Sequence, residues 1–255
     1  MIAPARLTAP DAQQKPPLLS RLIPSARREA GTYSELGRKV NGKALMQRPS
    51  PLQNRVTPTG EIEAVPARGL YTGNRGVLHG DGYTLGAARW KHRNWIICAL
   101  AFKGRRRALM TPRRWTELFF LDEAVALAAG HRPCAECRRA AYNSWMAAVT
   151  EGLGRPRPAA PEADRLLHQE RAVPGARRLK THVAAMAGLP DGAFVLTAEG
   201  QPALTLGDSL RPWTHFGYGP PVARPKGQAR LLTPPMNVAA LRAGYRPTLH
   251  PSAAA

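Results

Sequence analysis

The chain has 255 residues, and 37 lysines and arginines against 17 aspartates and glutamates give it a formal net charge of +20. An excess of this size favours polyanionic partners, with nucleic acid ahead of an anionic membrane surface. No apolar run approaches the roughly 18 residues of a membrane span, and the N-terminus lacks the apolar core of a secretory signal. Three cysteines indicate metal or redox use in a reducing compartment rather than a disulfide scaffold, so we expect a cytoplasmic protein.

The N-terminal segment, residues 1–50, is rich in proline, alanine, glutamine and arginine and has no sustained hydrophobic period. Prolines flank its one apolar cluster, Leu18 to Ile23, and would stop a helix there. We therefore predict a disordered basic arm.

Residues 51–110 have β character. WIICALAF at 95–102 is apolar on both faces, which predicts a buried strand. Lys103-Gly104 is typical of a turn, and residues 107–110 would then form the return strand of a hairpin.

Two helices follow. The first is predicted at 121–129, with Asp122 or Thr116 as its cap and Gly130 as its stop. The second is predicted at 138–151, where the apolar residues recur with helical spacing: Tyr142, Trp145, Met146 and Val149.

The composition of residues 153–163 is that of a linker. Beyond it we predict short helices at 163–169, 178–187 and 238–243, a hairpin at 193–206 and a strand at 229–232. The whole is predicted to be an α+β protein of antiparallel hairpins and short helices. It would comprise a zinc-knuckle module at 51–152 and a C-terminal α+β region at 164–255.

Cys134 and Cys137 form a C-x-x-C between the two predicted helices. Two thiolates at such a turn can converge on one ion, with Zn–S distances of about 2.3 Å, and the following helix N-terminus favours the thiolate form. Tetrahedral zinc needs two more ligands, and the candidates are Cys98, His79, His92, His131 and Asp81. A redox pair and two inert buried thiols are the alternatives; no thioredoxin-like βαβ pattern supports the redox pair.

The sequence AVALAAGHRPCAECRR at 124–139 resembles the second half of the zinc-binding domain of Ada-type DNA-repair methyltransferases. In that family a phenylalanine-rich strand end and an alanine-rich helix precede Gly–aromatic–Arg–Pro–Cys–x–x–Cys, and residues 119–137 match in order. The resemblance extends over about residues 68–139. In its first half the turn at 73–76 and His79 match, but Tyr83 stands near the place of the expected cysteine.

The resemblance implies a zinc site formed by Cys134, Cys137 and His79, with Cys98 as the fourth ligand and Asp81 or His92 as substitutes. It does not carry over the methyl-accepting role, because the reactive cysteine of that family belongs to the pair that is missing here.

The stretch KGRRRALMTPRR at 103–114 holds six cations and no acid. At the tip of the predicted hairpin these cations would grip phosphates, and arginines beside the cysteines would extend the same face. A solvated turn is the alternative. The predicted nucleic-acid-binding residues are Lys103, Arg105, Arg106, Arg107, Arg113, Arg114, Arg138 and Arg139.

The sequence thus favours a zinc-stabilised nucleic-acid-binding protein, with DNA ahead of RNA as partner. The first alternative is a metal-dependent nuclease or another nucleic-acid-processing hydrolase, with His168 or His182 as general base. The second alternative is a protein-interaction scaffold whose charge is incidental. No Gly-rich phosphate loop and no G-x-S-x-G or H-E-x-x-H motif is present.

Overall fold

The computed structural model describes residues 39–40, 43–44, 48–104 and 108–254. The chain divides into two compact units, Met1–Leu45 and Met46–Ala255. The described part of the first unit is an antiparallel pair of strands, β1 (Lys39–Val40) and β2 (Lys43–Ala44). Most of the arm predicted at 1–50 lies outside the described residues.

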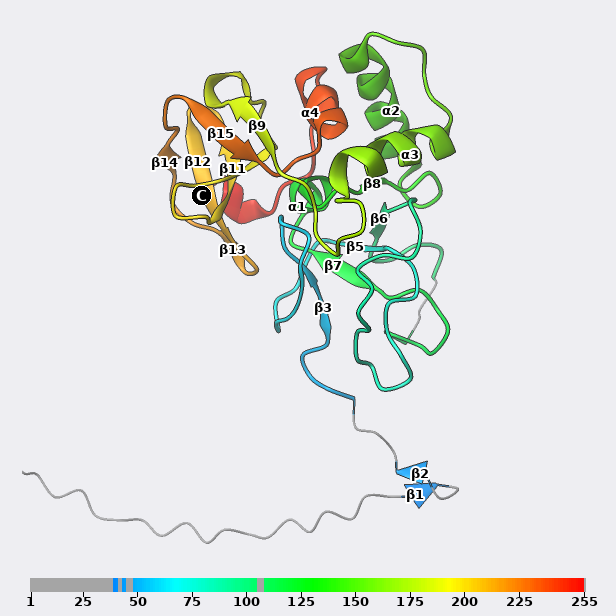
Figure 1. Cartoon of the computed structure of the whole chain (residues 1–255). Coiled ribbons are helices and arrows are strands. Elements are labelled where there is room, and N and C mark those ends of the chain that lie inside the picture. The colour runs from blue at the N-terminus through cyan, green and yellow to red at the C-terminus, as the bar shows by residue number, and fades with distance from the viewer. Residues whose placement is uncertain (1–38, 41–42, 45–47, 105–107, 255) are drawn as a thin grey trace, which may run out of the picture. The chain divides into compact units, whose positions relative to one another are not determined.

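The second unit has an α+β fold with two sheets (Figure 1). The first sheet has six strands in the order β4-β3-β7-β5-β6-β8. Most neighbours are antiparallel, but β3 with β7 and β6 with β8 run parallel. Its strands are β3 (Gln53–Val56), β4 (Ile62–Ala64), β5 (Tyr71–Asn74), β6 (Ile96–Ala99), β7 (Leu118–Phe120) and β8 (Arg132–Pro133).

The hairpin predicted around Lys103 is wrong in its described part. The buried segment does form a strand, β6, but β5 pairs with one of its edges and β8 with the other. No edge of β6 is left for a return strand. Residues 108–110 form a turn instead, and residues 105–107 lie outside the described residues.

The second sheet is antiparallel and has seven strands, in the order β13-β12-β11-β10-β15-β9 with β14 also paired to β12. The hairpin predicted at 193–206 and the strand predicted at 229–232 are confirmed. The helix predicted at 178–187 is wrong, because β9 pairs with β15 along its whole length. The strands of this second sheet are β9 (His182–Ala185), β10 (Phe194–Leu196), β11 (Pro202–Leu206), β12 (Ser209–Thr214), β13 (Gly217–Tyr218), β14 (Val222–Ala223) and β15 (Gln228–Leu231).

Helix α1 (Glu123–Ala128) lies between the two sheets and packs against β7 and β10 (Figure 1). All six of its residues are buried, which explains why the helix is apolar on every side after Glu123. Asp122 caps it by accepting a hydrogen bond from the Val125 N–H.

The other helices are α2 (Arg139–Leu153), α3 (Ala160–Arg171) and α4 (Pro235–Arg242), and short 3₁₀ turns occur at Met186–Gly188 and Pro251–Ala253. Helix α2 packs against α4, and Gly152 allows this close approach. A Cβ atom at Gly152 would lie 2.4 Å from the Ala239 carbonyl oxygen.

One hydrophobic core runs through both sheets and all four of these helices. The stretch predicted as a linker, residues 153–163, leads directly from α2 to α3, and both helices bury residues in that core. The predicted module and the predicted C-terminal region therefore share their interior. No helix among the described residues is long and apolar enough to cross a membrane.

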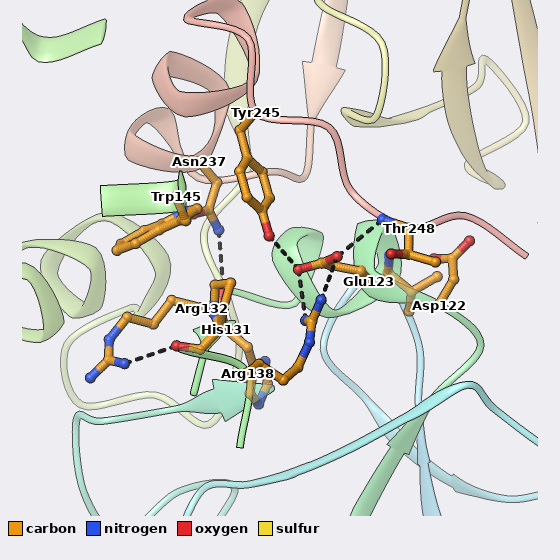
Figure 2. Close-up of polar contacts among 11 residues, drawn as sticks. Asp122, Glu123, His131, Arg132, Arg138, Trp145, Asn237, Tyr245 and Thr248 are labelled. Atoms are coloured by element: carbon orange, nitrogen blue, oxygen red, sulfur yellow. Dashed lines mark hydrogen bonds and ion pairs between the residues drawn. The ribbon is translucent and has the colours of Figure 1, made fainter. Parts of the chain in front are cut away.

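Polar contacts fix the last part of the chain to the start of α1 (Figure 2). Glu123 accepts two hydrogen bonds from the Arg138 guanidinium, at 2.7 and 2.9 Å. It also accepts from the Tyr245 hydroxyl at 2.5 Å and the Thr248 N–H at 3.0 Å. Because Glu123 is buried, these four donors are what stabilise its charge in the interior.

Candidate metal centre and the pockets beside it

The three cysteines converge on one point. Cys98 lies on β6, and β8 runs parallel to β6 so that the Cys134 N–H donates to the Ile97 carbonyl at 2.9 Å. A tight turn after β8, closed by the Arg138 N–H on the Cys134 carbonyl at 3.2 Å, returns Cys137 to the same place. The three sulfur atoms lie within 4.8 Å of one another, so this group could hold a metal ion.

The thiols are electrostatically coupled. A hydrogen bond with Cys98, together with the Glu136 N–H at 3.4 Å, lowers the pKa of Cys134 to about 5. The same hydrogen bond and burial raise the pKa of Cys98, and burial raises that of Cys137. Of the three cysteines, Cys134 is therefore the one whose thiolate form is favoured. An ion would have to displace the other two protons, which couples metal binding to pH.

His79 does not belong to this group. Its Nδ1 lies 2.7 Å from the Thr116 hydroxyl oxygen and its Nε2 lies 3.2 Å from the Thr111 carbonyl oxygen. Of the other candidates, His92 binds the Asn74 amide oxygen through Nε2 at 3.2 Å, and neither His131 nor Asp81 joins the group. Within the described residues the sulfur atoms thus offer three of the four ligands that a tetrahedral ion takes.

A pocket of about 280 Å³, here called the cysteine pocket, opens beside the sulfur atoms. The strand register explains its floor: Thr72 stands opposite both Cys98 and Phe119, so these side chains share one face of the sheet. The lining residues are Thr72, Asn74, Ile96, Cys98, Ala99, Leu100, Phe102, Leu109, Trp115, Glu117, Phe119, Cys134, Glu136 and Cys137.

Glu117 is the buried carboxylate of the cysteine pocket, with 5% of its surface exposed. Its Oε2 accepts a hydrogen bond from the Met110 N–H at 2.7 Å, which ties the loop before β7 to the sheet. The Thr72 hydroxyl on the floor donates to the Leu118 carbonyl at 2.9 Å. These contacts hold the polar groups of the pocket in fixed positions.

A second pocket of about 630 Å³, here called the arginine groove, adjoins the first. The two share Leu100, Leu109 and Phe119. The lining contains three arginines and no acid: Arg48, Pro49, Ser50, Pro51, Leu52, Asn54, Arg55, Pro66, Arg68, Gly69, Leu100, Leu109 and Phe119.

Arg55 shows the electrostatic character of the arginine groove. Burial and the neighbouring charge of Arg68 lower its pKa. Its Nε donates to the Ala67 carbonyl at 2.5 Å, and its guanidinium carbon lies 4.9 Å from the centre of the Phe119 ring. The three arginines are scattered in the sequence, so no charge run pointed to them. Only the fold gathers them.

The predicted nucleic-acid-binding residues divide into three groups. Arg138 is held inside by Glu123 and by the ring of Tyr71, 4.2 Å away, and only 10% of its side chain is exposed. Arg105, Arg106 and Arg107 lie outside the described residues. The remaining residues are exposed: Lys103, Arg113, Arg114 and Arg139.

The two predicted catalytic histidines lie away from the cysteines. His168 is on α3, edge-on to Trp90 and Trp95, and burial and the charge of Arg171 lower its pKa to about 4. His182 is on β9 of the second sheet, and burial lowers its pKa. Neither lines the cysteine pocket, whose two carboxylates are the buried Glu117 and the exposed Glu136.

Two buried arginines occupy the other side of α1. The guanidinium carbons of Arg75 and Arg171 lie 4.3 and 3.8 Å from the centre of the Trp95 ring. Arg75 donates to the Ala129 carbonyl and Arg171 to the Gly130 carbonyl, at the C-terminal end of α1. The negative end of the helix dipole thus helps to compensate these two buried charges, and we assign both arginines to stability.

Comparisons with protein-family models, curated proteins and solved structures found no match.

Proposed function

We propose that this protein is a zinc-stabilised nucleic-acid-binding protein that prefers DNA. Zinc is the metal best suited to the cysteine cluster, because thiolate ligands in a tetrahedral arrangement favour it over the harder divalent ions. The resemblance of residues 124–139 to the Ada zinc module supports the same metal.

The observation that carries nucleic-acid binding is the arginine groove beside the cysteine pocket. Three arginines line it without an acid, and burial and the charge of Arg68 lower the pKa of Arg55. An anion there would relieve this repulsion, and the planar guanidinium group suits phosphate oxygens. Exposed cations on the neighbouring loops, Lys103, Arg113 and Arg114, would extend the positive field.

The zinc part is tested by measuring the metal content of protein purified without added metal and without affinity tags that bind metal. We expect one zinc per chain. A chelator should remove it and lower the midpoint of thermal unfolding, because metal binding and folding are linked. Full thermal stability in a metal-free preparation would refute this role of zinc.

The nucleic-acid part is tested by fluorescence anisotropy with labelled single-stranded DNA, duplex DNA and RNA at several salt concentrations. We expect DNA to bind more tightly than RNA, with log affinity falling by about 0.9 for each phosphate contacted per tenfold rise in salt on duplex DNA. Affinity that is absent, or that does not respond to salt, would contradict the proposal.

A hydrolase is the second candidate, because three protein ligands with a fourth position open to water are the arrangement of catalytic zinc sites, and the cysteine cluster supplies three ligands. The buried carboxylate of Glu117 in the same pocket could accept a proton from water. Incubation of labelled DNA and RNA with the zinc-loaded protein, with and without added Mg²⁺ or Mn²⁺, tests this. Intact substrate under all conditions would exclude a nuclease.

A further inference from the structure

We propose that the cysteine pocket receives a single unpaired base of a bound DNA strand, while the arginine groove holds the phosphates of the same strand. This inference rests on the proposed function and specifies what the protein recognises in DNA. Four features carry it: the size of the pocket, its stacking surfaces, its polar groups and its connection to the arginine groove.

The size of the cysteine pocket suits one base. At about 280 Å³ it lies just below the range of roughly 300–1,000 Å³ for sites that hold drug-sized molecules. Its floor is the face of a sheet, below the surrounding loops, and the floor residues Thr72 and Asn74 are buried. A base that is stacked and paired inside a duplex cannot enter a pocket, so the base must be unpaired or turned out of the helix.

The walls of the pocket suit a flat ring. Phe102, Trp115 and Phe119 all line it, and their apolar surface is what an aromatic base requires for stacking. Stacking on protein aromatics contributes about 1–3 kcal/mol per base and tolerates all four bases. The aromatic walls would therefore favour a nucleotide with a base over an abasic site, without selecting among the bases.

The polar groups of the pocket match the edge of an amino-bearing base. Glu117 is a carboxylate acceptor, and carboxylates accept from the exocyclic amino group of cytosine in DNA recognition. The amide oxygen of Asn74 is already paired with His92, so the amide nitrogen is the group that Asn74 has for a ligand. A carboxylate acceptor and an amide donor in one pocket suit a base that presents an amino group next to a ring nitrogen, as cytosine and adenine do.

The connection between the cysteine pocket and the arginine groove favours a base that belongs to a DNA strand over a free heterocycle as the ligand. The pocket and the groove share Leu100, Leu109 and Phe119 on their common border. A base in the pocket therefore has its own backbone at the edge of a space lined by Arg48, Arg55 and Arg68. A free heterocycle would leave this arginine cluster without a partner.

The experiment compares three labelled DNA duplexes of the same sequence. The first carries one bulged adenine, the second an abasic bulge at the same place, and the third is fully paired. We expect the zinc-loaded protein to bind the bulged adenine about tenfold more tightly than the abasic bulge, as stacking of one base predicts. With 2-aminopurine in place of the bulged adenine, its fluorescence should change on binding.

Two pocket variants and two controls make the comparison specific. Glu117→Gln keeps an oxygen for the Met110 N–H but loses the charge, and Ile96→Phe fills part of the floor; each should reduce the preference for the bulged adenine to about twofold or less. Leu70→Phe, at an exposed position outside both pockets and directly before β5, should keep the preference. Arg68→Glu should weaken binding to all three duplexes by a similar factor.

Zinc content and far-UV circular dichroism equal to those of the wild type will show that each variant is folded. Equal affinity for the bulged adenine and the abasic bulge would overturn the base pocket and leave DNA binding intact. A preference that survives in both pocket variants would also overturn it. If none of the three duplexes binds, the proposed function fails together with this inference.

Discussion

The two sheets of this protein use their polar side chains in different ways. On the first sheet, Thr72, Asn74, Cys98 and Glu117 line a pocket. On the second, the buried Thr205 hydroxyl donates to two backbone carbonyls. The Thr205 hydroxyl is thus used inside the fold, whereas the first sheet holds a row of polar groups toward a space that a ligand can enter. The strands of the first sheet are short, and long loops complete its walls.

The largest expected effect is the loss of zinc, and it distinguishes the three-cysteine group seen in the structure from the ligand set with His79 expected from the sequence. Cys98→Ser should lose stoichiometric zinc, because Cys98 completes the three-sulfur group. His79→Gln should keep zinc, because His79 lies at Thr116 instead. At zinc about a thousandfold above its dissociation constant, binding stabilises by about 4 kcal/mol, and the serine variant should lose that amount.

Metal content and urea unfolding measure both quantities. Loss of zinc in the His79→Gln variant, with retention in Cys98→Ser, would restore the ligand set expected from the Ada resemblance and contradict the one built on β6.

The second effect is a loss of stability, compared between a buried ion pair beside the first sheet and an exposed ion pair beside the second sheet. Asp164 binds Arg132 through two hydrogen bonds of 2.7 Å, and both side chains are at least 93% buried, so Asp164→Ala leaves an uncompensated cation between α3 and β8. We expect a loss of about 3 kcal/mol in the free energy of unfolding. Asp191 pairs with Arg224 beside the second sheet at 3.3 Å and is 52% exposed, so Asp191→Ala should cost less than about 1 kcal/mol.

Urea unfolding of the two variants gives the comparison directly. Equal losses would mean that burial of the pair does not determine its contribution here.

The third effect is loss of stability in acid. Burial lowers the pKa of His92, His131 and His168 around Trp95, while the second sheet contributes only His182 among the histidines whose pKa is lowered. A histidine with a depressed pKa binds its proton more tightly in the unfolded state. Stability is therefore full above the ordinary histidine pKa of about 6.5 and falls as the pH drops toward 4.

Fully buried His131 should contribute most of this slope, at about 1.4 kcal/mol per pH unit over the range in which only the unfolded state is protonated. Unfolding measured from pH 7 to pH 5 in the wild type and in His131→Asn tests this. A variant with the slope of the wild type would show that another group is responsible.

The smallest effect concerns the surface. Arg68→Glu in the arginine groove should weaken DNA binding by about tenfold at moderate salt and reduce the salt slope by about 1. Arg230→Glu makes the same charge change on an exposed position of β15 and should alter affinity much less. Anisotropy titrations of both variants compare the two surfaces, and equal losses would mean that net charge alone governs binding.

Local signals in the sequence predicted local structure well. Gly130 and Gly244 end their helices with φ values of 80° and 94°, and Asp122 caps α1, as expected from their residue types. Cys98 could be named as a ligand because it is the one cysteine outside the C-x-x-C. These predictions needed only neighbours along the chain or the chemistry of a rare residue.

The failures share a different cause. The second edge of β6 is occupied by β8, which follows about 35 residues later in the chain and runs parallel, so nothing near Lys103 excludes a hairpin. The floor of the cysteine pocket depends on the register across β5, β6 and β7, and the arginine groove joins residues from separate loops. Such features arise from long-range pairing, which residue composition and spacing do not encode.

The contacts at the start of α1 have a consequence for synthesis on the ribosome. Tyr245 and the His250 N–H reach Glu123 and Asp122 from 122 and 128 residues further along the chain. The cysteines emerge much earlier than these partners. During translation the nascent thiols can meet a metal ion while the acidic pair still lacks partners that the finished fold provides. A metal ion held by the cysteines would therefore be in place before Asp122 and Glu123 gain the partners that lie more than 120 residues further along the chain.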